Sequence, residues 1–399
     1  MNVPAKRLCE RPALRPDDPR FSSGPCKKHP GWNLSSLSAD NLGRSHRASI
    51  PKSRLQEAIS HSAKLLHLPD NWQLAIVPAS DTGAFELALW SMLGKCGVDV
   101  FVWESFSNDW ADDIQNQLKI EDLNIFQADY GDLPDLSQTK IDRDIVFVYN
   151  GTTSGVRVPN LDWISPNQKS LVFCDATSAV FAMELDYKKL DVVTWSWQKV
   201  LGSEGGFGML ALSPKAIERL ESYQPSRPLP KIFRITKNGK ITQSVFKGAT
   251  LNTPSMLALE DLHSALKWAE SIGGLSSLIQ RCNNNFKAVD NWVRQTDWID
   301  WLPNRAETLS TTSMCLKVVS KEFLILSEEQ QQIAIGLMCQ WLEEEDVAYD
   351  IAAYRSAPIG FRVWGGATIE SSDLNKLMPW LDWAYGRWLN EELNSGETL

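Results

Sequence analysis

Between about residues 50 and 215, short apolar runs alternate with stretches of helical spacing, and this alternation limits the fold more than any other feature. The helical stretches include Phe85–Leu93 and Trp110–Leu118. Strands that alternate with helices are joined by right-handed crossovers and form a mainly parallel sheet. Several runs are continuously apolar, which is expected where helices cover both faces of the sheet. The predicted strands are Leu74–Val77, Val98–Trp103, Ile145–Tyr149, Leu171–Cys174, Val192–Trp197 and Gly208–Leu212.

The rest of the chain is divided around this alternating segment. Residues 1–20 are rich in proline and charge and are predicted to form an extended N-terminal tail. Residues 21–270 are predicted to form a large domain, in which Thr253 caps a helix with Pro254 in its first turn. Residues 271–399 are predicted to form a smaller α+β domain. Its expected elements are helices at about Leu275–Trp292, Glu328–Glu344 and Leu374–Leu389 and strands at Ser313–Val319 and Gly360–Trp364.

Composition excludes several classes of protein. The chain has 399 residues, of which 43% are hydrophobic, and this suits two folded domains rather than a disordered chain. Forty basic against 49 acidic residues give a net charge of -9, which disfavours a general nucleic-acid binder. No uncharged run approaches the ~18 residues of a membrane span, and residues 1–20 lack the apolar region of a secretory signal. We therefore expect a cytoplasmic protein.

The seven cysteines carry no recognisable metal or disulfide pattern. None stands in a Cys-x-x-Cys pair or at the Cys/His spacing of a zinc site. Reduced thiols are the simplest account, and they agree with a cytoplasmic location. The sequence therefore predicts neither a metal site nor a disulfide framework.

The strongest chemical signal is a predicted strand that leads to Lys199 and then into a glycine-rich turn, Gly202–Gly208. In open α/β sheets, ligands bind at the carboxyl ends of the strands. A lysine held there can form a Schiff base with pyridoxal phosphate, although a surface lysine at a strand end is the alternative. Asp175 follows the strand Leu171–Cys174, and pyridoxal phosphate needs a carboxylate at its ring nitrogen. An aspartate in this position can also be a simple helix cap.

Ser80, Asp81 and Thr82 lie between a predicted strand and a helix expected to start near Ala84. Free amides at a helix N-terminus, together with two hydroxyls, form a cradle for a phosphate. An ordinary capping turn is the alternative. Because a carboxylate beside a phosphate is repelled, we expect the Asp81 side chain to turn away and cap the helix while its amide faces the ligand.

With these residues in view, the chain resembles the phosphoserine aminotransferases, a family of class V aminotransferases among the fold-type I pyridoxal-phosphate enzymes. The resemblance runs from Phe21 to about Trp388. It implies a large domain with a mainly parallel, seven-stranded sheet covered by helices, and a smaller C-terminal α+β domain. Asp175 and the Ser196–Lys199 segment mark the whole superfamily, whereas Phe21–Pro25 and Ser45–Arg47 point to the phosphoserine enzymes. The matching segments are Phe21–Pro25, Ser45–Arg47, Asp175, Ser196–Lys199, Asn252–Pro254 and Gly360–Arg362.

The resemblance assigns cofactor roles to residues on several segments. Lys199 is implied to be the Schiff-base lysine and proton shuttle, and Asp175 to pair with the ring nitrogen. Thr152 is implied to bind the phenolic oxygen and Gln198 the phosphate. The neighbouring subunit of a homodimer with shared active sites is implied to add two more phosphate contacts. The full implied cofactor set is Ser80, Asp81, Thr82, Phe106, Thr152, Asp175, Gln198, Lys199, Asn252 and Thr253.

Two family features are altered in this chain. Many members have an arginine in the phosphate loop, where this chain has Ser80–Thr82. The aromatic residue that stacks on the cofactor is usually tryptophan, and the best alignment places Phe106 there, with Trp103 and Trp110 close enough to be alternatives.

The substrates of the family carry two anionic groups, which arginine binds well through its planar fork. By resemblance, Arg362 binds the α-carboxylate, and His46 and Arg47 assist at the substrate anion. Arg355 is one residue away from the family's spacing and is assigned to the substrate phosphate. A solvated or ion-paired surface residue is the alternative for each arginine.

The implied activity is transamination between phosphoserine and 2-oxoglutarate, giving 3-phosphohydroxypyruvate and glutamate, or the reverse, in L-serine biosynthesis. A further substrate, 4-phosphohydroxythreonine in pyridoxine biosynthesis, is implied for some bacterial members and stays open here. The main alternative is another class V aminotransferase that acts on serine, alanine or glyoxylate. A cysteine desulfurase is disfavoured because Cys315 and Cys339 lie within predicted regular elements. A catalytically silent binding protein of the same fold is disfavoured because Lys199 and Asp175 are both present.

Overall fold

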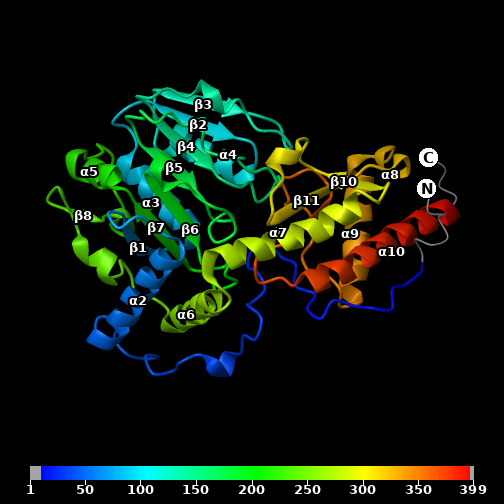
Figure 1. Ribbon diagram of the computed structural model, residues 1–399. Helices are drawn as coiled ribbons and strands as arrows, with labels where there is room; N and C mark the ends of the chain where they lie inside the picture. The colour runs from blue at the N-terminus through cyan, green and yellow to red at the C-terminus, as the bar shows by residue number, and fades with distance from the viewer. Residues whose placement is uncertain (1–9, 396–399) are drawn as a thin grey trace.

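The computed structural model describes residues 10–395 and is built around one large sheet and one small sheet (Figure 1). The large sheet has seven strands in the order β1-β7-β6-β5-β4-β2-β3. All neighbouring pairs are parallel except the two that β7 makes with β1 and β6. The predicted mainly parallel sheet is confirmed. Its strands are β1 (Gln73–Pro78), β2 (Val98–Val102), β3 (Leu123–Gln127), β4 (Asp144–Val148), β5 (Val172–Asp175), β6 (Val192–Ser196) and β7 (Phe207–Leu212).

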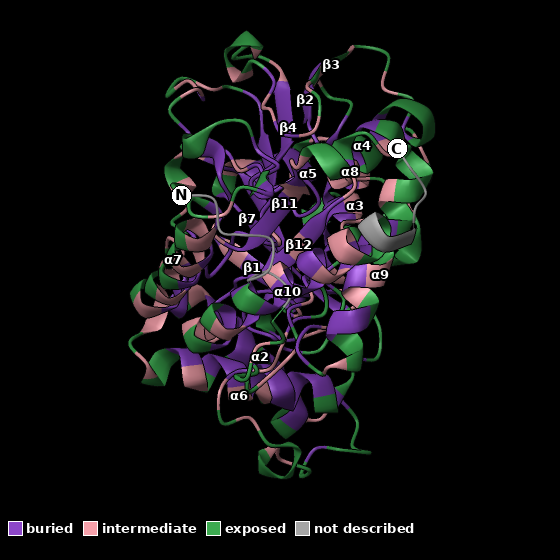
Figure 2. Ribbon diagram, turned by 90° about the vertical axis from the view of Figure 1, so that its right-hand side faces the viewer, coloured by how far each residue is buried: buried purple, intermediate pink, exposed green. Residues whose placement is uncertain are grey.

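Burial explains why continuous apolar runs form the central strands. Every residue of β2, β4, β5, β6 and β7 is buried. Figure 2 shows buried strands in the interior and helices with exposed outer surfaces around them. Strands covered on both faces need no alternation of polar and apolar residues. The edge strand β3 is mostly exposed or half-buried and mixes both kinds of residue, so the sequence patterns did not predict it.

Helices surround the large sheet, and α3 packs against β1, β6 and β7. The predicted N-terminal ends of two helices are wrong. The helix after β1 begins at Ser80 rather than near Ala84, and α6 is capped by Ser255, whose hydroxyl accepts a hydrogen bond from the Ala258 amide, rather than by Thr253. The helices are α2 (Ser49–Leu65), α3 (Ser80–Met92), α4 (Ser105–Asp112) with a following π turn (Asp113–Gln117), α5 (Pro214–Ser222), α6 (Met256–Ser271) and α7 (Gly274–Val293).

The C-terminal part is an α+β unit, as predicted, and Figure 1 shows α7 running from the large sheet towards it. Its three strands are antiparallel in the order β10-β11-β12, and α10 packs against α7 and α9. The three-residue strand β10 was too short to predict. The domain boundary near residue 270 stays a prediction. The elements are β10 (Ile299–Trp301), β11 (Ser313–Val318), α8 (Lys321–Leu324), α9 (Glu328–Glu344), β12 (Phe361–Trp364) and α10 (Ser371–Ser395).

The described part of the N-terminal tail, residues 10–20, contains no helix and runs along the C-terminal unit. The Trp380 indole N–H donates to the Leu14 carbonyl at 2.8 Å, and the Tyr349 amide donates to the Pro19 carbonyl at 2.8 Å. The predicted tail over residues 1–9 lies outside the described residues.

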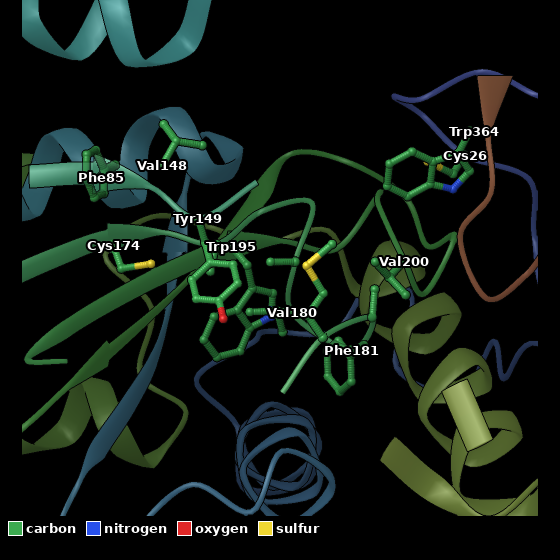
Figure 3. Close-up of a cluster of buried hydrophobic side chains, with 14 of the residues drawn as sticks. Cys26, Phe85, Val148, Tyr149, Cys174, Val180, Phe181, Trp195, Val200 and Trp364 are labelled. Atoms are coloured by element: carbon green, nitrogen blue, oxygen red, sulfur yellow. The ribbon is translucent and has the colours of Figure 1, made fainter. Parts of the chain in front are cut away.

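From Phe21 the chain crosses to the edge of the large sheet. The Trp364 amide donates to the Phe21 carbonyl, and the Cys26 amide donates to the Gln198 carbonyl, both at 3.0 Å. Figure 3 shows the side chains of Cys26 and Trp364 lying close together. This segment therefore ties β12 to the end of β6.

Within residues 10–395, none of the helices combines the length and apolar character that crossing a membrane requires. The six cysteines of this range are unpaired. The same residues contain no group of three or more candidate metal ligands.

A buried ion pair joins α5 to the start of β4 in the large sheet. The Arg219 guanidinium donates to both carboxylate oxygens of Asp144 at 2.8 and 3.0 Å, and these two side chains are 8% and 0% exposed. Asp144 also accepts the Leu171 amide at 2.8 Å. Removing the arginine leaves a buried charge without its counter-ion.

We expect Arg219→Ala to lower the free energy of unfolding by about 3–5 kcal/mol, because breaking a buried pair strands the remaining charge. Urea unfolding followed by far-UV circular dichroism measures the loss. Arg294→Ala, which removes the exposed partner of Asp290, is the matched control and should leave the midpoint nearly unchanged. Equal effects of the two substitutions would contradict the prediction.

Candidate active site

A pocket of about 210 Å³ lies at the carboxyl edge of the large sheet, between the ends of β5 and β6. Asp175 is the last residue of β5 and pairs in register with Thr194 of the parallel strand β6. Lys199 follows β6 by three residues, and both side chains line the pocket. The structure therefore brings together the two groups on which the sequence argument rested. Six further predicted cofactor residues line the same pocket, namely Ser80, Asp81, Thr82, Phe106, Thr152 and Gln198.

The Asp175 carboxylate is buried but receives two hydrogen bonds. The Trp110 indole N–H donates to Oδ2 at 3.1 Å, and the Thr177 amide donates to Oδ1 at 3.0 Å. Donors of this kind favour the ionised form of a carboxyl group. These two donors fix the orientation of the Asp175 carboxyl group, which faces the pocket.

The Lys199 amine is enclosed by the N-terminal segment. Its Nζ donates to the Ser23 carbonyl at 2.5 Å, and a Cβ at Gly24 would lie 2.8 Å from Nζ. A side chain at position 24 would therefore displace the amine from its present position. Burial lowers the pKa of Lys199 below that of an ordinary lysine, and the Arg362 guanidinium lowers this pKa further.

The turn between β1 and α3 presents backbone amides to the pocket. Ala79 and Ser80 both have left-handed backbones, with φ of 65° and 55°, which turns the chain sharply into the helix. The Gly206 amide donates to Ser80 Oγ at 3.0 Å and holds this turn in place. First-turn amides have no acceptor within their own helix and carry the positive end of the helix dipole. They suit an anion such as a phosphate.

Asp81 does not cap α3, which corrects the expectation for its side chain. Ala79 occupies the cap position and α3 has no side-chain cap. Asp81 lies in the first turn, is 6% exposed, and has both carboxyl oxygens buried without a hydrogen-bond partner among residues 10–395. Burial raises its pKa well above the ordinary value, and the neighbouring Asp175 raises it further.

Several buried polar atoms at the pocket have no partner within residues 10–395. They are Asn150 Oδ1, Thr177 Oγ1, Ser196 Oγ and Gln198 Oε1, in addition to the oxygens of Asp81. Buried polar groups are normally hydrogen-bonded, so these atoms indicate a polar ligand. An amine, an opposing carboxylate and a free helix N-terminus match the aldehyde, ring nitrogen and phosphate of pyridoxal phosphate. The residues present fit this cofactor.

Two aromatic side chains, Phe106 and Trp110, line the pocket. The third candidate, Trp103, is buried elsewhere and donates its indole N–H to the Val156 carbonyl at 3.1 Å. Which of the two lining residues stacks on a cofactor stays a prediction.

Glu104 supports both the aromatic residues and the Thr152 loop, and the sequence patterns did not single it out. Its carboxylate caps α4 by accepting the Ser107 amide at 2.9 Å, and it accepts the Thr153 hydroxyl at 2.6 Å. Burial raises the pKa of Glu104 to about 7. A glutamate before a serine-rich helix start was the only available signal, and it indicates a cap rather than a site.

The candidate substrate residues fall into two groups. The Arg355 and Arg362 guanidinium carbons lie 5.8 and 5.6 Å from the Tyr354 ring centroid, and that ring lies 5.8 Å from the Phe106 ring. Both arginines therefore lie beside the pocket, and Arg362 Nε is buried without a partner among the described residues. His46 is buried and Arg47 exposed, but neither lines the pocket.

The exposed residues Asn252 and Thr253 also lie outside the pocket lining of their own chain. They precede α6, where the Asn252 side chain bonds only to the Thr253 carbonyl, at 3.2 Å, among the interactions of the described residues. Their predicted role therefore depends on a second chain.

The chain is similar in sequence to known aminotransferases. The family model described as Aminotransferase class-V matches residues 108–342. The phosphoserine aminotransferases of Methanosarcina barkeri and Methanosarcina mazei are each 55% identical to the chain over 375 residues, which cover 94% of this chain and 99% of the relative.

Solved structures share the fold at much lower identity. A phosphoserine aminotransferase from Bacillus circulans subsp. alkalophilus superposes with a TM-score of 0.74 at 16% identity and covers 92% of this chain and 98% of its own. A ureidoglycine-glyoxylate aminotransferase from Bacillus subtilis gives 0.74 at 12% identity and covers 97% and 100%. Fold similarity alone thus does not separate these activities.

We expect Lys199 to react with an amine-specific acylating reagent with a pH midpoint below the ~10.4 of an ordinary lysine, because burial favours its neutral form. Mass spectrometry of cofactor-free protein labelled across a pH series measures the midpoint. The exposed Lys188 provides the internal reference. Coinciding midpoints for Lys188 and Lys199 would contradict the expectation.

Proposed function

Since the chain belongs to the class V aminotransferase family and, within it, to the phosphoserine aminotransferases, we propose that it transfers an amino group between phosphoserine and 2-oxoglutarate through pyridoxal phosphate, in L-serine biosynthesis. The observation that carries this proposal is the meeting of Lys199 and Asp175 in one pocket beside the free N-terminus of α3. The 55% identity over nearly the whole length supports the substrate assignment.

The side chains of the pocket divide the chemistry among them. Bound pyridoxal phosphate supplies a ring that withdraws electrons from the substrate's α-carbon. Lys199 Nζ would take the proton from that carbon and deliver it to the carbon that carries the cofactor's aldehyde, a role suited to an amine whose pKa is lowered by burial. Asp175, held by Trp110 and Thr177, keeps a proton on the ring nitrogen.

The substrate's anions are bound by arginines of the C-terminal unit. The charge of Arg362 acts on Lys199, and its Nε is buried without a partner among residues 10–395, so it binds the α-carboxylate. Arg355 is exposed on the adjoining surface and binds the phosphate. In this proposal, residues 21–270 hold the cofactor, and residues 271–399 carry Arg355 and Arg362.

The working unit is a homodimer in which each site borrows residues from the other subunit. Asn252 and Thr253 reach the phosphate of the neighbouring site, and His46 and Arg47 assist at the substrate anion. The exclusion of these residues from the pocket of their own chain supports this arrangement. A cytoplasmic location belongs to the same proposal and is supported by the unpaired cysteines of residues 10–395.

An aminotransferase for serine, alanine or glyoxylate is the competing function. Such small substrates have no phosphate, and Arg355 then has no ligand to bind. A desulfurase is disfavoured further because burial raises the pKa of the Cys315 thiol to about 12, so the nucleophilic thiolate is scarce.

Replacing the lysine tests the central assignment. Lys199→Ala should lower kcat with phosphoserine and 2-oxoglutarate by about 10²–10⁴-fold or more, because the proton-transferring amine is lost. The same variant should lose the visible absorbance of lysine-bound cofactor. Lys188→Ala, on the exposed surface, is the control and should keep both properties.

Substrate choice is decided in the same experiment by mixing the unaltered enzyme separately with phosphoserine, serine and alanine. Phosphoserine should change the visible spectrum fastest. Faster reaction with serine or alanine would favour the competing function, and normal turnover by Lys199→Ala would refute transamination through this pocket.

Subunit mixing tests the shared sites. Lys199→Ala and the double variant Asn252→Ala/Thr253→Ala should each be impaired alone. A one-to-one mixture that has exchanged subunits should regain about a quarter of wild-type activity, because half of the dimers are mixed and each holds one intact site. If Lys199 and the pair Asn252 and Thr253 of one site came from the same chain, mixing would restore no activity.

A further inference from the structure

The Asp81 carboxyl group has no role in the chemistry described so far, yet it lies inside the pocket. The side chain points inward from the first turn of α3, and it lines the pocket together with Asp175 and Lys199. Its neighbours are the carboxylate of Asp175 and the hydroxyls of Thr177 and Thr194. Two carboxyl groups therefore share one small, buried space.

The two carboxyl groups have unequal surroundings. Asp175 accepts N–H donors from Trp110 and Thr177, whereas Asp81 accepts no N–H donor from residues 10–395 and has only the hydroxyls of Thr177 and Thr194 beside it. When like charges share a site, one group keeps its proton, and it is the group with fewer stabilising donors. The proton therefore stays on Asp81.

The other ionisable groups around the two carboxyl groups do not change which of them keeps the proton. Cys174 precedes Asp175 on β5, and burial raises the pKa of its thiol, so it is uncharged. Glu104 lies on the side of Asp175, where it adds negative charge. The positive charge of Lys199 acts on Asp175, although burial lowers the pKa of this amine.

We propose that Asp81 is a positioning residue that stays protonated, donates a hydrogen bond to the Asp175 carboxylate, and so limits the pair to one negative charge beside the cofactor's phosphate site. The inference rests on the proposed function, since it takes pyridoxal phosphate as the occupant of the pocket.

This arrangement resolves the conflict between a carboxyl group and a phosphate cradle in the same helix turn. A neutral Asp81 leaves the amides at the start of α3 free to attract the phosphate. An ionised Asp81 places a second negative charge between Asp175 and that phosphate. Because burial raises its pKa well above the ordinary value, the neutral form persists to higher pH than in an ordinary aspartate and is lost as the pH rises through the raised value.

Binding of pyridoxal phosphate to the cofactor-free full-length protein tests the proposal without any turnover. Dissociation constants are measured across a pH series by tryptophan fluorescence quenching and by visible absorbance. The comparison is between the unaltered protein and Asp81→Asn, which mimics the neutral acid. Ionisation of Lys199 and of the cofactor affects both proteins equally and cancels in the ratio of their constants.

Below the pH at which Asp81 ionises, the two dissociation constants should agree within about threefold, since both side chains are neutral there. Above the pH at which Asp81 ionises, the unaltered protein should bind more weakly, by about tenfold for each further pH unit. Glu86→Gln, which removes a half-buried carboxyl from the same helix outside the pocket lining, should match the unaltered protein throughout.

Equal pH dependence of the unaltered protein and Asp81→Asn would overturn the inference and leave the proposed function intact. Weaker binding by Asp81→Asn at every pH would also overturn it, because the charge rather than the proton would then be needed. Absence of cofactor binding in all proteins at every pH would refute the proposed function and this inference with it.

A second variant and a second measurement cover the case in which Asp81→Asn does not fold. Asp81→Ser, which is also uncharged, replaces it in the same titration with the same expected ratio. Infrared spectra of the unaltered protein at pH 8 should show the carbonyl band of a protonated carboxyl group. Glu104, with a pKa of about 7, is mostly ionised under these conditions, and absence of the band would overturn the inference.

Discussion

The adjacency of two parallel strands is the constraint on which the rest of this site depends. β5 and β6 are hydrogen-bonded neighbours, so the residues that follow their last pairs emerge at the same edge of a fully buried sheet. This places a carboxylate and an amine around one pocket although 24 residues separate Asp175 from Lys199. The antiparallel strand β7 continues the sheet beyond β6 without disturbing that edge.

Charge is the second constraint, because the pocket concentrates ionisable groups with little access to water. Asp175 has donors that stabilise its negative charge, whereas the amine of Lys199 has lost much of its solvation. Glu104 uses its carboxylate to hold α4 and the Thr152 loop together. A second carboxyl at position 81 is compatible with an anionic ligand only in its neutral form, and this gives the pocket a dependence on pH that its lysine and aspartate do not explain.

The pocket is completed by segments that are distant in sequence. The N-terminal segment encloses the amine through Ser23 and Gly24, and it is fastened to β12 through the Phe21 carbonyl. The loop that carries the arginines contacts the start of α4, where the Ser356 and Ser105 hydroxyls lie 2.7 Å apart. The proposed substrate residues Arg355 and Arg362 thus belong to a different unit from the proposed cofactor residues, and the two units meet at α4.

The sequence by itself determined the mainly parallel sheet, the C-terminal α+β unit and the positions of Asp175 and Lys199. These features follow from local patterns: apolar runs mark buried strands, and polar residues at strand ends mark the ligand-binding edge. The family resemblance added the arginines beside Tyr354, and the structure does place them next to the pocket.

Only the tertiary structure decided which way the polar side chains point. Asp81 looked like a helix cap, but α3 begins one residue before it, so its carboxyl faces Asp175 instead of the backbone. Trp110 was expected only as an alternative stacking ring, yet its indole N–H donates a hydrogen bond to Asp175. The physical reason is that the direction of a side chain depends on where its helix starts and on what packs against it, and neither is encoded in the residue's immediate neighbours.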